Sequence, residues 1–308
     1  MMRILVTGGG GFIGSYLINE LSTKNQIICL DHKSKNAIFP KNVKNVSFVK
    51  GDVSDPKILK KAFQKPIDCV IHLAGVLGNG ACMENPTNAV LSHVYGTQEL
   101  CQKSIESNVK HFIFASTQSV YSTFKKRKNP LNEKMTSEPD DFYGSLKASA
   151  EFTLKNSGLN YTILRFANVF GYNPHVSQKG GAIENFIKAV FNKSDITIYG
   201  TGKQKIDYVN IKDVSNCIKH VIKNSRTYNE IFNIGSGELH SIAEIAKMVS
   251  STGKTLTGNQ TKIKKLPAPG DKIWPDRLMS IRKIKNSLGW NPDTSFKRGI
   301  QEIMEKRI

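Results

Sequence analysis

The most informative stretch of this chain is Arg3-Ile4-Leu5-Val6-Thr7-Gly8-Gly9-Gly10-Gly11-Phe12-Ile13-Gly14. A short apolar run breaks into consecutive glycines and continues with apolar residues at helical spacing, which predicts a strand, a tight turn and a helix in that order. Glycine allows backbone amides to approach a pyrophosphate, and the start of a helix adds favourable partial charge. Two registers of a dinucleotide-binding fingerprint fit, Gly9-x-Gly11-x-x-Gly14 and Gly8-x-x-Gly11-x-x-Gly14.

A second apolar run, residues 26–30, ends on Asp31. This carboxylate lies about 20 residues beyond the central glycine, which is the spacing expected of an acidic residue that accepts from the ribose hydroxyls of a bound adenosine. A carboxylate repels a phosphate at the same place. The sequence therefore predicts a dinucleotide without a 2′-phosphate.

Strands and helices alternate along most of the chain. Apolar runs predict further strands at residues 46–50, 68–73, 111–116, 161–166 and 231–234, and helices at 86–107, 141–155, 182–191 and 242–249. This alternation predicts an α/β fold with a parallel, doubly wound sheet, in which ligands bind at the carboxyl ends of the strands. We expect residues 1–166, with about 207–235, to form the dinucleotide-binding domain, and 167–206 with 236–308 to form a smaller substrate-binding lobe.

The composition is globular, with 39% hydrophobic and 22% charged residues. No apolar run reaches the roughly 18 residues of a transmembrane helix. The five cysteines are scattered, which favours reduced thiols in a cytoplasmic protein over disulfides or a metal site. The net charge of +19 permits nucleic-acid binding, but the lysines are spread along the chain, so neither nucleic acid nor membrane is an expected partner.

A second informative element is Tyr143-Gly144-Ser145-Leu146-Lys147. Positions i and i+4 of a helix share one face, so the Tyr143 hydroxyl and the Lys147 ammonium are expected on the same side. A nearby cation lowers the pKa of a phenol, which would make Tyr143 a general base. Thr117, which follows the predicted strand 111–116, places a hydroxyl at the same edge of the sheet as the glycine turn.

These residues resemble the extended short-chain dehydrogenase/reductase family, in its nucleotide-sugar epimerase/dehydratase branch with a Rossmann domain. The resemblance runs nearly from end to end of the chain. Besides the glycine turn and Tyr143-x-x-x-Lys147, the motifs that carry it include Gly51-Asp52-Val53, His72-Leu73-Ala74-Gly75, Leu164-Arg165-Phe166-Ala167-Asn168-Val169-Phe170-Gly171, Gly200-Thr201-Gly202-Lys203-Gln204, Phe232-Asn233-Ile234-Gly235-Ser236-Gly237 and Leu288-Gly289-Trp290.

The resemblance implies NAD as cofactor and a nucleotide-diphosphate sugar as substrate. Tyr143 would take a proton from a sugar hydroxyl, Lys147 would hold the nicotinamide ribose, and Thr117 would hydrogen-bond the reacting oxygen. The implied cofactor contacts are Gly8, Gly11, Phe12, Ile13, Gly14, Asp31, Asp52, Val53, Leu73, Ala74, Gly75, Tyr143, Lys147 and Phe166. The implied substrate contacts are Thr117, Tyr143 and Asn168, and the family suggests a homodimer through the predicted helices 86–107 and 141–155.

Departures from the family pattern narrow the reaction. Thr117 is followed by Gln118-Ser119, where the 4,6-dehydratases carry an Asp-Glu acid–base pair and the 3,5-epimerase/4-reductases carry a cysteine in place of Ser119. Oxidation and reduction at one carbon remain, which is a 4-epimerase or a simple dehydrogenase or reductase. A non-catalytic dinucleotide-binding regulator is the alternative from another class of protein.

Other departures concern the substrate. Ile206 and Ala268 stand where the family has arginines that grip the substrate diphosphate. Arg277, Lys205 and Lys203 could compensate for the lost charge. Arg277, which follows Pro269-Gly270-Asp271, is our predicted replacement because a guanidinium binds phosphate oxygens in a bidentate manner, whereas lysine offers no planar fork. His93 stands where the family has asparagine, and we interpret it as a packing or helix-surface histidine.

Overall fold

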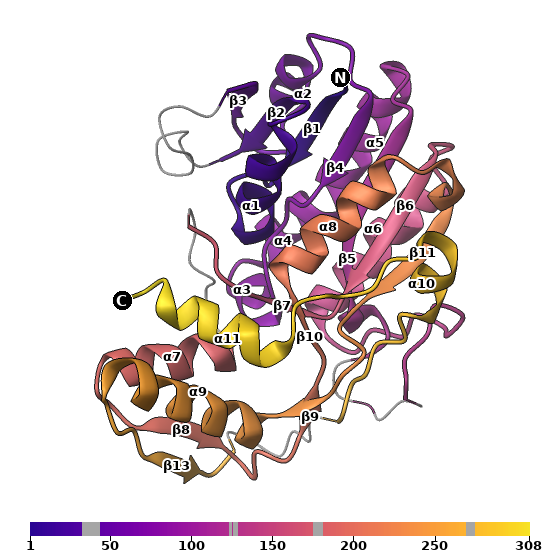
Figure 1. The fold of residues 1–308 in the computed structure, drawn as a ribbon. Helices are drawn as coiled ribbons and strands as arrows, with labels where there is room; N and C mark the ends of the chain where they lie inside the picture. The colour runs from indigo at the N-terminus through magenta and orange to yellow at the C-terminus, as the bar shows by residue number, and fades with distance from the viewer. Residues whose placement is uncertain (33–43, 123–124, 126–128, 175–180, 269–274) are drawn as a thin grey trace.

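A computed structural model describes the chain except for residues 33–43, 123–124, 126–128, 175–180 and 269–274. Its centre is a seven-stranded parallel sheet with the strand order β11-β6-β5-β4-β1-β2-β3 (Figure 1). The strands are β1 (Arg3–Thr7), β2 (Gln26–Asp31), β3 (Val46–Lys50), β4 (Cys69–His72), β5 (His111–Thr117), β6 (Tyr161–Phe166) and β11 (Glu230–Ile234). The predicted parallel, doubly wound α/β fold is confirmed, and each predicted strand is found to within a residue or two.

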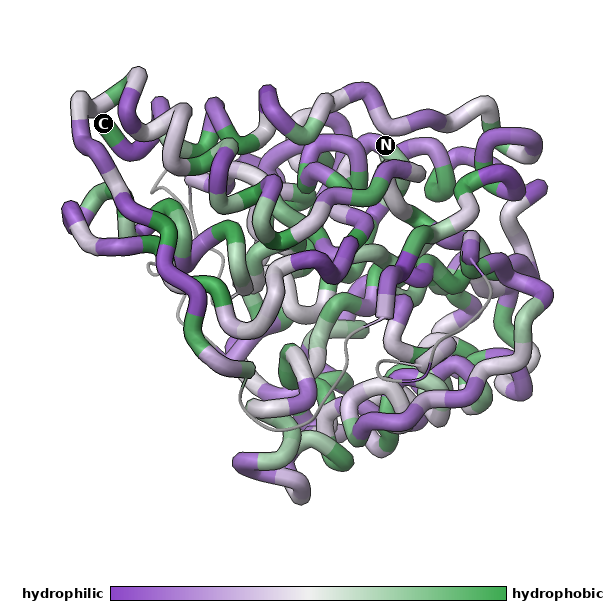
Figure 2. The backbone as a smooth tube through the Cα atoms, turned by 90° about the horizontal axis from the view of Figure 1, so that it is seen from below, coloured by the Kyte–Doolittle hydropathy of each residue, from purple (hydrophilic) through white to green (hydrophobic). Residues whose placement is uncertain are grey.

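Helices cover both faces of the sheet, which is why the central strands are apolar on both sides. Along β1, Ile4 and Val6 join one core and Leu5 joins the opposite one. The first core lies under α1 (Phe12–Leu21), α8 (Ile211–Ile222) and α10 (Arg282–Leu288), and the second under α2 (Pro56–Ala62), α5 (Gly96–Glu106) and α6 (Phe142–Lys155). In Figure 2 the hydrophobic segments run through the interior, and hydrophilic segments predominate at the rim.

A third core, centred on residues such as Ile187 and Val249, lies in the lower lobe of Figure 1. It is built from α7 (Ala182–Phe191), β8 (Ile196–Tyr199), α9 (Ile242–Thr257) and α11 (Phe296–Glu305). The exposed strand β13 (Ile263–Leu266) pairs with β8 at its edge. The remaining short strands form two pairs: β7 (Asn168–Phe170) with β10 (Tyr208–Asn210), and β9 (Lys205–Ile206) with β12 (His240–Ser241). Helix α9 extends beyond its predicted end at residue 249 because Gly253 lets it pack closely on Val190 of α7.

The predicted helix 86–107 is interrupted. It consists of α4 (Pro86–Val90), a π-helical segment η2 (Leu91–Tyr95) and α5, and it is preceded by α3 (Asn79–Glu84). A π turn adds a residue to the repeat and rotates the apolar face. Leu100 is fully buried, whereas Val90 and Ile105, which we expected on the same apolar face, are 41% and 43% exposed. Val90 lies before the π segment, and Ile105 lies roughly 140° from Leu100 around α5.

Two short 3₁₀ segments, η3 (Gln118–Val120) and η4 (Ser225–Thr227), complete the regular structure. All five cysteines are buried free thiols. Within the described part of the chain, the helices are all too short or too polar to cross a membrane.

Candidate functional site

The glycine turn lies at the carboxyl end of β1, at the edge of the sheet where the other parallel strands also end. Gly8 has φ +68°, and a Cβ there would lie 2.7 Å from the Ala74 nitrogen, so only glycine fits. The Gly11 amide donates to the Gly8 carbonyl (3.0 Å), and Gly11 is the N-cap of α1. A Cβ at Gly14 would collide with the same carbonyl. This geometry favours the register Gly8-x-x-Gly11-x-x-Gly14.

Asp31 ends β2 beside this turn, as the sequence predicts for the residue that receives the ribose. Its carboxylate is buried, and Oδ2 accepts a hydrogen bond from the Gly10 amide at 2.8 Å. The carboxylate thus also fixes the glycine turn, a contact that the spacing alone does not reveal.

A pocket of about 360 Å³ follows this edge of the sheet. Of the predicted cofactor residues, it is lined by Gly8, Gly11, Asp31, Asp52, Val53, Leu73, Ala74 and Gly75, and it is completed by Leu30, His32, Gly51, Val76, Asn88 and Ser92. Phe166 belongs to the core beneath the sheet instead, and Phe12 and Ile13 are half-buried at the start of α1. A glycine turn at one wall and a buried carboxylate at the next strand fit the diphosphate and ribose of NAD.

The three predicted catalytic residues come together next to this pocket. Tyr143 lies in the first turn of α6, which Asp141 caps by accepting from the Gly144 amide (2.6 Å). Thr117, at the end of β5, lies near the Tyr143 hydroxyl and acts to lower its pKa. Lys147 lies one turn further along and donates from Nζ to the Ala115 carbonyl at 2.8 Å.

Burial dominates the electrostatics of this pair. It raises the pKa of Tyr143 well above its usual value of about 10. Burial also lowers the pKa of Lys147 to about 8. The sequence predicted that Lys147 would lower the pKa of Tyr143. In the structure the pKa of Tyr143 is raised, because desolvation of the phenolate is the largest effect on it.

Two residues that the motifs did not identify hold Tyr143 in place. The Asn79 side chain accepts from the Phe142 amide (3.0 Å) and the Tyr143 amide (3.4 Å), so α3 caps the helix that carries the tyrosine. The His93 ring lies edge-on to the Tyr143 ring, with 5.7 Å between centroids, and its Nε2 lies 2.9 Å from the Val76 carbonyl. His93 is 1% exposed, which agrees with the predicted packing role.

Polar side chains continue from Thr117 toward the C-terminal lobe. Gln118 is buried and donates from Nε2 to Oδ1 of Asn168 (3.0 Å), and Asn168 is also hydrogen-bonded to Tyr208. Gln118 therefore occupies, as a neutral amide, the place where a dehydratase would need an acid.

Arg277 lies beside Ile206. The two residues form a backbone bridge, and the Arg277 amide donates to the Lys205 carbonyl at 3.1 Å. The Arg277 side chain is 9% exposed, burial lowers its pKa, and its Nε has no hydrogen-bond partner among the described residues. The segment Pro269-Gly270-Asp271 lies outside the described residues.

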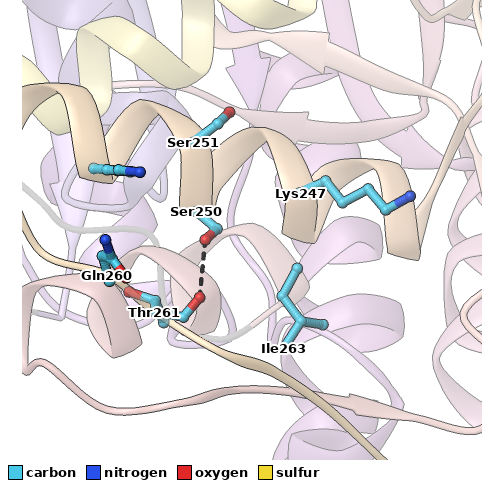
Figure 3. A pocket seen from close by; sticks show the side chains of 7 residues that line it. Lys247, Ser250, Ser251, Gln260, Thr261 and Ile263 are labelled. Carbon is cyan, nitrogen blue, oxygen red and sulfur yellow. Dashed lines mark hydrogen bonds between the residues drawn. The ribbon is translucent and has the colours of Figure 1, made fainter.

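A second, open pocket of about 290 Å³ lies on the lower lobe, between α9 and the segment that leads into β13 (Figure 3). The Ser250 hydroxyl donates to the Thr261 carbonyl across it (3.1 Å), and exposed Lys247 and Lys254 flank it. It shares no lining residue with the pocket along the sheet edge.

A parallel sheet with a glycine turn at its first strand–helix junction, and a tyrosine–lysine pair at the same edge, define a dinucleotide-dependent enzyme of the oxidoreductase type. The chain belongs to the NAD dependent epimerase/dehydratase family, whose model matches residues 4–235. This confirms the resemblance to the extended short-chain dehydrogenases/reductases and their nucleotide-sugar branch.

Relatives cover almost the whole chain. A putative UDP-glucose 4-epimerase of Methanocaldococcus jannaschii is 30% identical over 98% of this chain and 97% of its own length. The crystal structure of the Thermotoga maritima UDP-glucose 4-epimerase with UDP-glucose superposes with a TM-score of 0.87 at 29% identity, covering 99% of this chain and 98% of that one. The Thermus thermophilus UDP-glucose 4-epimerase in complex with NAD superposes with a TM-score of 0.86 at 25% identity, with coverage of 99% and 98%. The family and this neighbour identify NAD as the cofactor.

Proposed function

We propose that this protein is an NAD-dependent epimerase of a nucleotide-diphosphate sugar that oxidises and reduces one sugar carbon, as a 4-epimerase does. The observation that carries the proposal is the Thr117–Tyr143–Lys147 arrangement at the cofactor edge, next to a neutral Gln118-Ser119 pair. This set can remove and return a proton while the nicotinamide serves as hydride acceptor and donor, but it lacks a second acid–base pair for the elimination of water.

In the proposed mechanism, Thr117 and Tyr143 bind the reacting hydroxyl, and Tyr143 Oη accepts its proton. Bound NAD would supply the hydride acceptor for the carbon-bound hydrogen and a positive nicotinamide ring that favours the Tyr143 phenolate. An ammonium has three N–H donors, so the bond from Lys147 to Ala115 leaves capacity to hold the nicotinamide ribose. Return of the hydride to either face of the carbonyl carbon, with return of the proton from Tyr143 to its oxygen, would complete the reduction and set the configuration.

The test is to incubate the protein with UDP-galactose or UDP-N-acetylglucosamine and substoichiometric NAD, and to analyse the sugars by NMR. Appearance of the 4-epimer without accumulation of NADH supports the proposal. Stoichiometric NADH would instead establish a net nucleotide-sugar oxidoreductase. Binding of NAD without conversion of any nucleotide sugar would favour a non-catalytic regulator.

We expect Asp31 to make the protein prefer NAD over NADP by about tenfold or more, because a carboxylate and a 2′-phosphate repel each other in a cleft. The Asp31→Asn variant keeps an oxygen for the Gly10 amide and should narrow the preference. Titration of both cofactors by protein fluorescence measures the ratio. Equal or tighter NADP binding by the wild-type protein would contradict the role of Asp31.

We propose that Arg277 replaces the missing arginines as the grip on the substrate diphosphate. Arg277→Ala should weaken nucleotide-sugar binding by about 1.5–3 kcal/mol, the range for a hydrogen bond to a charged group. NAD affinity should not change. Calorimetric titration with UDP measures the effect, with Lys203→Ala and Lys205→Ala as controls. Wild-type affinity in the Arg277 variant, with a loss in either lysine variant, would assign the grip to that lysine.

We also propose a homodimer through the surface formed by α4, η2 and α6. Large apolar side chains are exposed there, including Leu91, Tyr95 and Phe152, of which Phe152 is 67% exposed. Phe152→Glu should convert the dimer to a monomer, because a charge does not tolerate burial in an apolar interface. Light scattering after gel filtration measures the mass. Tyr199→Glu, on the lower lobe, is the matched control and should leave the dimer intact; a monomeric wild-type protein would refute the interface.

A further inference from the structure

A buried histidine links two threonines at the centre of the site. Thr7 and His72 are register partners at the carboxyl ends of β1 and β4, and Thr7 Oγ1 lies 2.7 Å from His72 Nδ1. On its other side, His72 Nε2 lies 3.0 Å from Oγ1 of Thr97, in the first turn of α5. All three side chains are 0% exposed. No step of the proposed reaction uses them.

The direction of each hydrogen bond in the Thr7–His72–Thr97 series follows from the partners at its two ends. Thr97 Oγ1 donates to the His93 carbonyl (2.5 Å), so it must accept from His72, and Nε2 of His72 carries the proton. Nδ1 is then an acceptor, and the Thr7 hydroxyl donates a hydrogen bond to it. Thr7 Oγ1 in turn accepts from the Ala74 amide (3.4 Å). Burial lowers the pKa of His72 well below its usual value, which keeps the ring neutral.

The hydrogen-bonded series Thr7–His72–Thr97 joins two parts of the site. At one end, Thr7 immediately precedes Gly8 of the cofactor turn, and Ala74 lines the cofactor pocket. At the other end, the His93 carbonyl belongs to η2, where the Gly96 amide bonds five residues back to Leu91. An isolated π turn inside an α-helix is a strained arrangement that needs support from its surroundings.

One side chain of this π segment, that of His93, contacts the catalytic tyrosine. The His93 ring packs on Gly75 so closely that a Cβ there would lie 2.7 Å from His93 Nδ1, and its edge meets the Tyr143 ring. A shift of the His93 backbone therefore moves the surface against which Tyr143 rests.

We propose that Thr7, His72 and Thr97 form a positioning chain that holds the π segment, and through His93 the Tyr143 ring, in register with the cofactor turn. The inference rests on the proposed role of Tyr143. Its energetic basis is geometric: a displacement of about 1 Å at a catalytic group can cost up to about 10²-fold in rate.

The test compares two hydroxyl deletions in the same helix. Thr97→Val removes the link between His72 and the His93 carbonyl. Ser104→Ala is the matched control, because the Ser104 hydroxyl is also buried and also donates to a carbonyl four residues back, that of Leu100 (2.7 Å), outside the chain. Thr97→Ser restores the donor and acceptor. Rates of UDP-galactose and UDP-N-acetylglucosamine epimerisation are expressed per NAD-binding site, which corrects for unfolded protein.

For Thr97→Val we expect kcat to fall about 10- to 100-fold, with KM and NAD affinity at wild-type values. Thr97→Ser and Ser104→Ala should retain the wild-type kcat. A Thr97→Val variant that behaves like Ser104→Ala, or that loses rate only in proportion to its NAD sites, overturns the positioning chain. Tyr143→Phe is measured in parallel: if it remains active, the proposed function fails, whereas an inactive Tyr143→Phe beside a fully active Thr97→Val refutes the chain alone.

A second measurement needs no variant. Nitrogen-15 NMR of the histidine rings in the wild-type protein should show His72 as the neutral Nε2–H tautomer at neutral pH. A proton on Nδ1 would reverse the hydrogen bonds to both threonines and overturn the inference even if Thr97→Val does not fold.

Discussion

Replacement of Tyr143 with phenylalanine is expected to abolish turnover while NAD affinity stays near the wild-type value. The substitution removes only the hydroxyl near Thr117, and it leaves the ring against His93 and Lys147 on its bond to Ala115. Loss of a general base usually costs about 10²–10⁴-fold in rate. Steady-state kinetics on UDP-galactose and UDP-N-acetylglucosamine, with NAD titration of the same samples, measure both quantities.

Tyr121→Phe is the matched control for this experiment. The Tyr121 hydroxyl is also buried, but it donates to Asn233 Oδ1 at 2.7 Å, a residue outside the Thr117–Tyr143–Lys147 set. Its loss should lower stability and leave kcat per NAD site unchanged. A Tyr143→Phe variant with more than a few per cent of the wild-type rate would refute the general-base role.

The second large effect concerns stability and comes from an ion pair behind the catalytic lysine. Glu151 lies one turn after Lys147 on α6 and is 2% exposed. It accepts from Arg165 NH2 at 2.6 Å and Nε at 2.9 Å, and from the Ser116 hydroxyl at 2.5 Å. The Arg165 guanidinium also lies over the Tyr121 ring, 4.8 Å from its centroid.

Arg165→Met should lower the free energy of unfolding by about 3–5 kcal/mol, because it leaves a buried carboxylate without its cation. The double variant Glu151→Met/Arg165→Met should recover most of that loss, since it removes both charges and keeps the volume. Urea unfolding without NAD measures the three proteins. A cost below about 1 kcal/mol for Arg165→Met, the value of an exposed pair, would contradict a strong buried interaction.

Much of the fold follows from local sequence. The apolar runs that end in glycine, aspartate or histidine are strands because they are buried on both faces, and their alternation with amphipathic helices allows few arrangements other than a parallel sheet. Gly8 and Gly11 could be assigned to a cofactor turn because glycine is required where a helix starts directly on a strand end. Tyr143 and Lys147 could be paired because four residues span one helical turn.

Other features depend on residues that are distant in the sequence. The π segment does not follow from a local pattern. The Thr97 hydroxyl, which bonds to the His93 carbonyl within it, also lies 3.0 Å from Nε2 of His72, a residue 25 positions earlier. The direction of the Tyr143 pKa shift depends on how completely α3 and His93 exclude water, and helical spacing carries no information about burial. The neighbours Ile206 and Arg277 meet through a backbone bridge between distant segments.

The amino-acid sequence thus specifies which segments form strands and helices and the class of cofactor, and it predicts the reacting groups, because each of these depends on residue type at short, regular spacing. Packing decides how those groups are held: that Asp31 fastens the Gly10 amide, that Asn79 caps the helix of Tyr143, and that Arg277 is buried beside Ile206. Hydrogen bonds and desolvation act across a few ångströms of space, and folding brings within that range side chains that the chain keeps far apart.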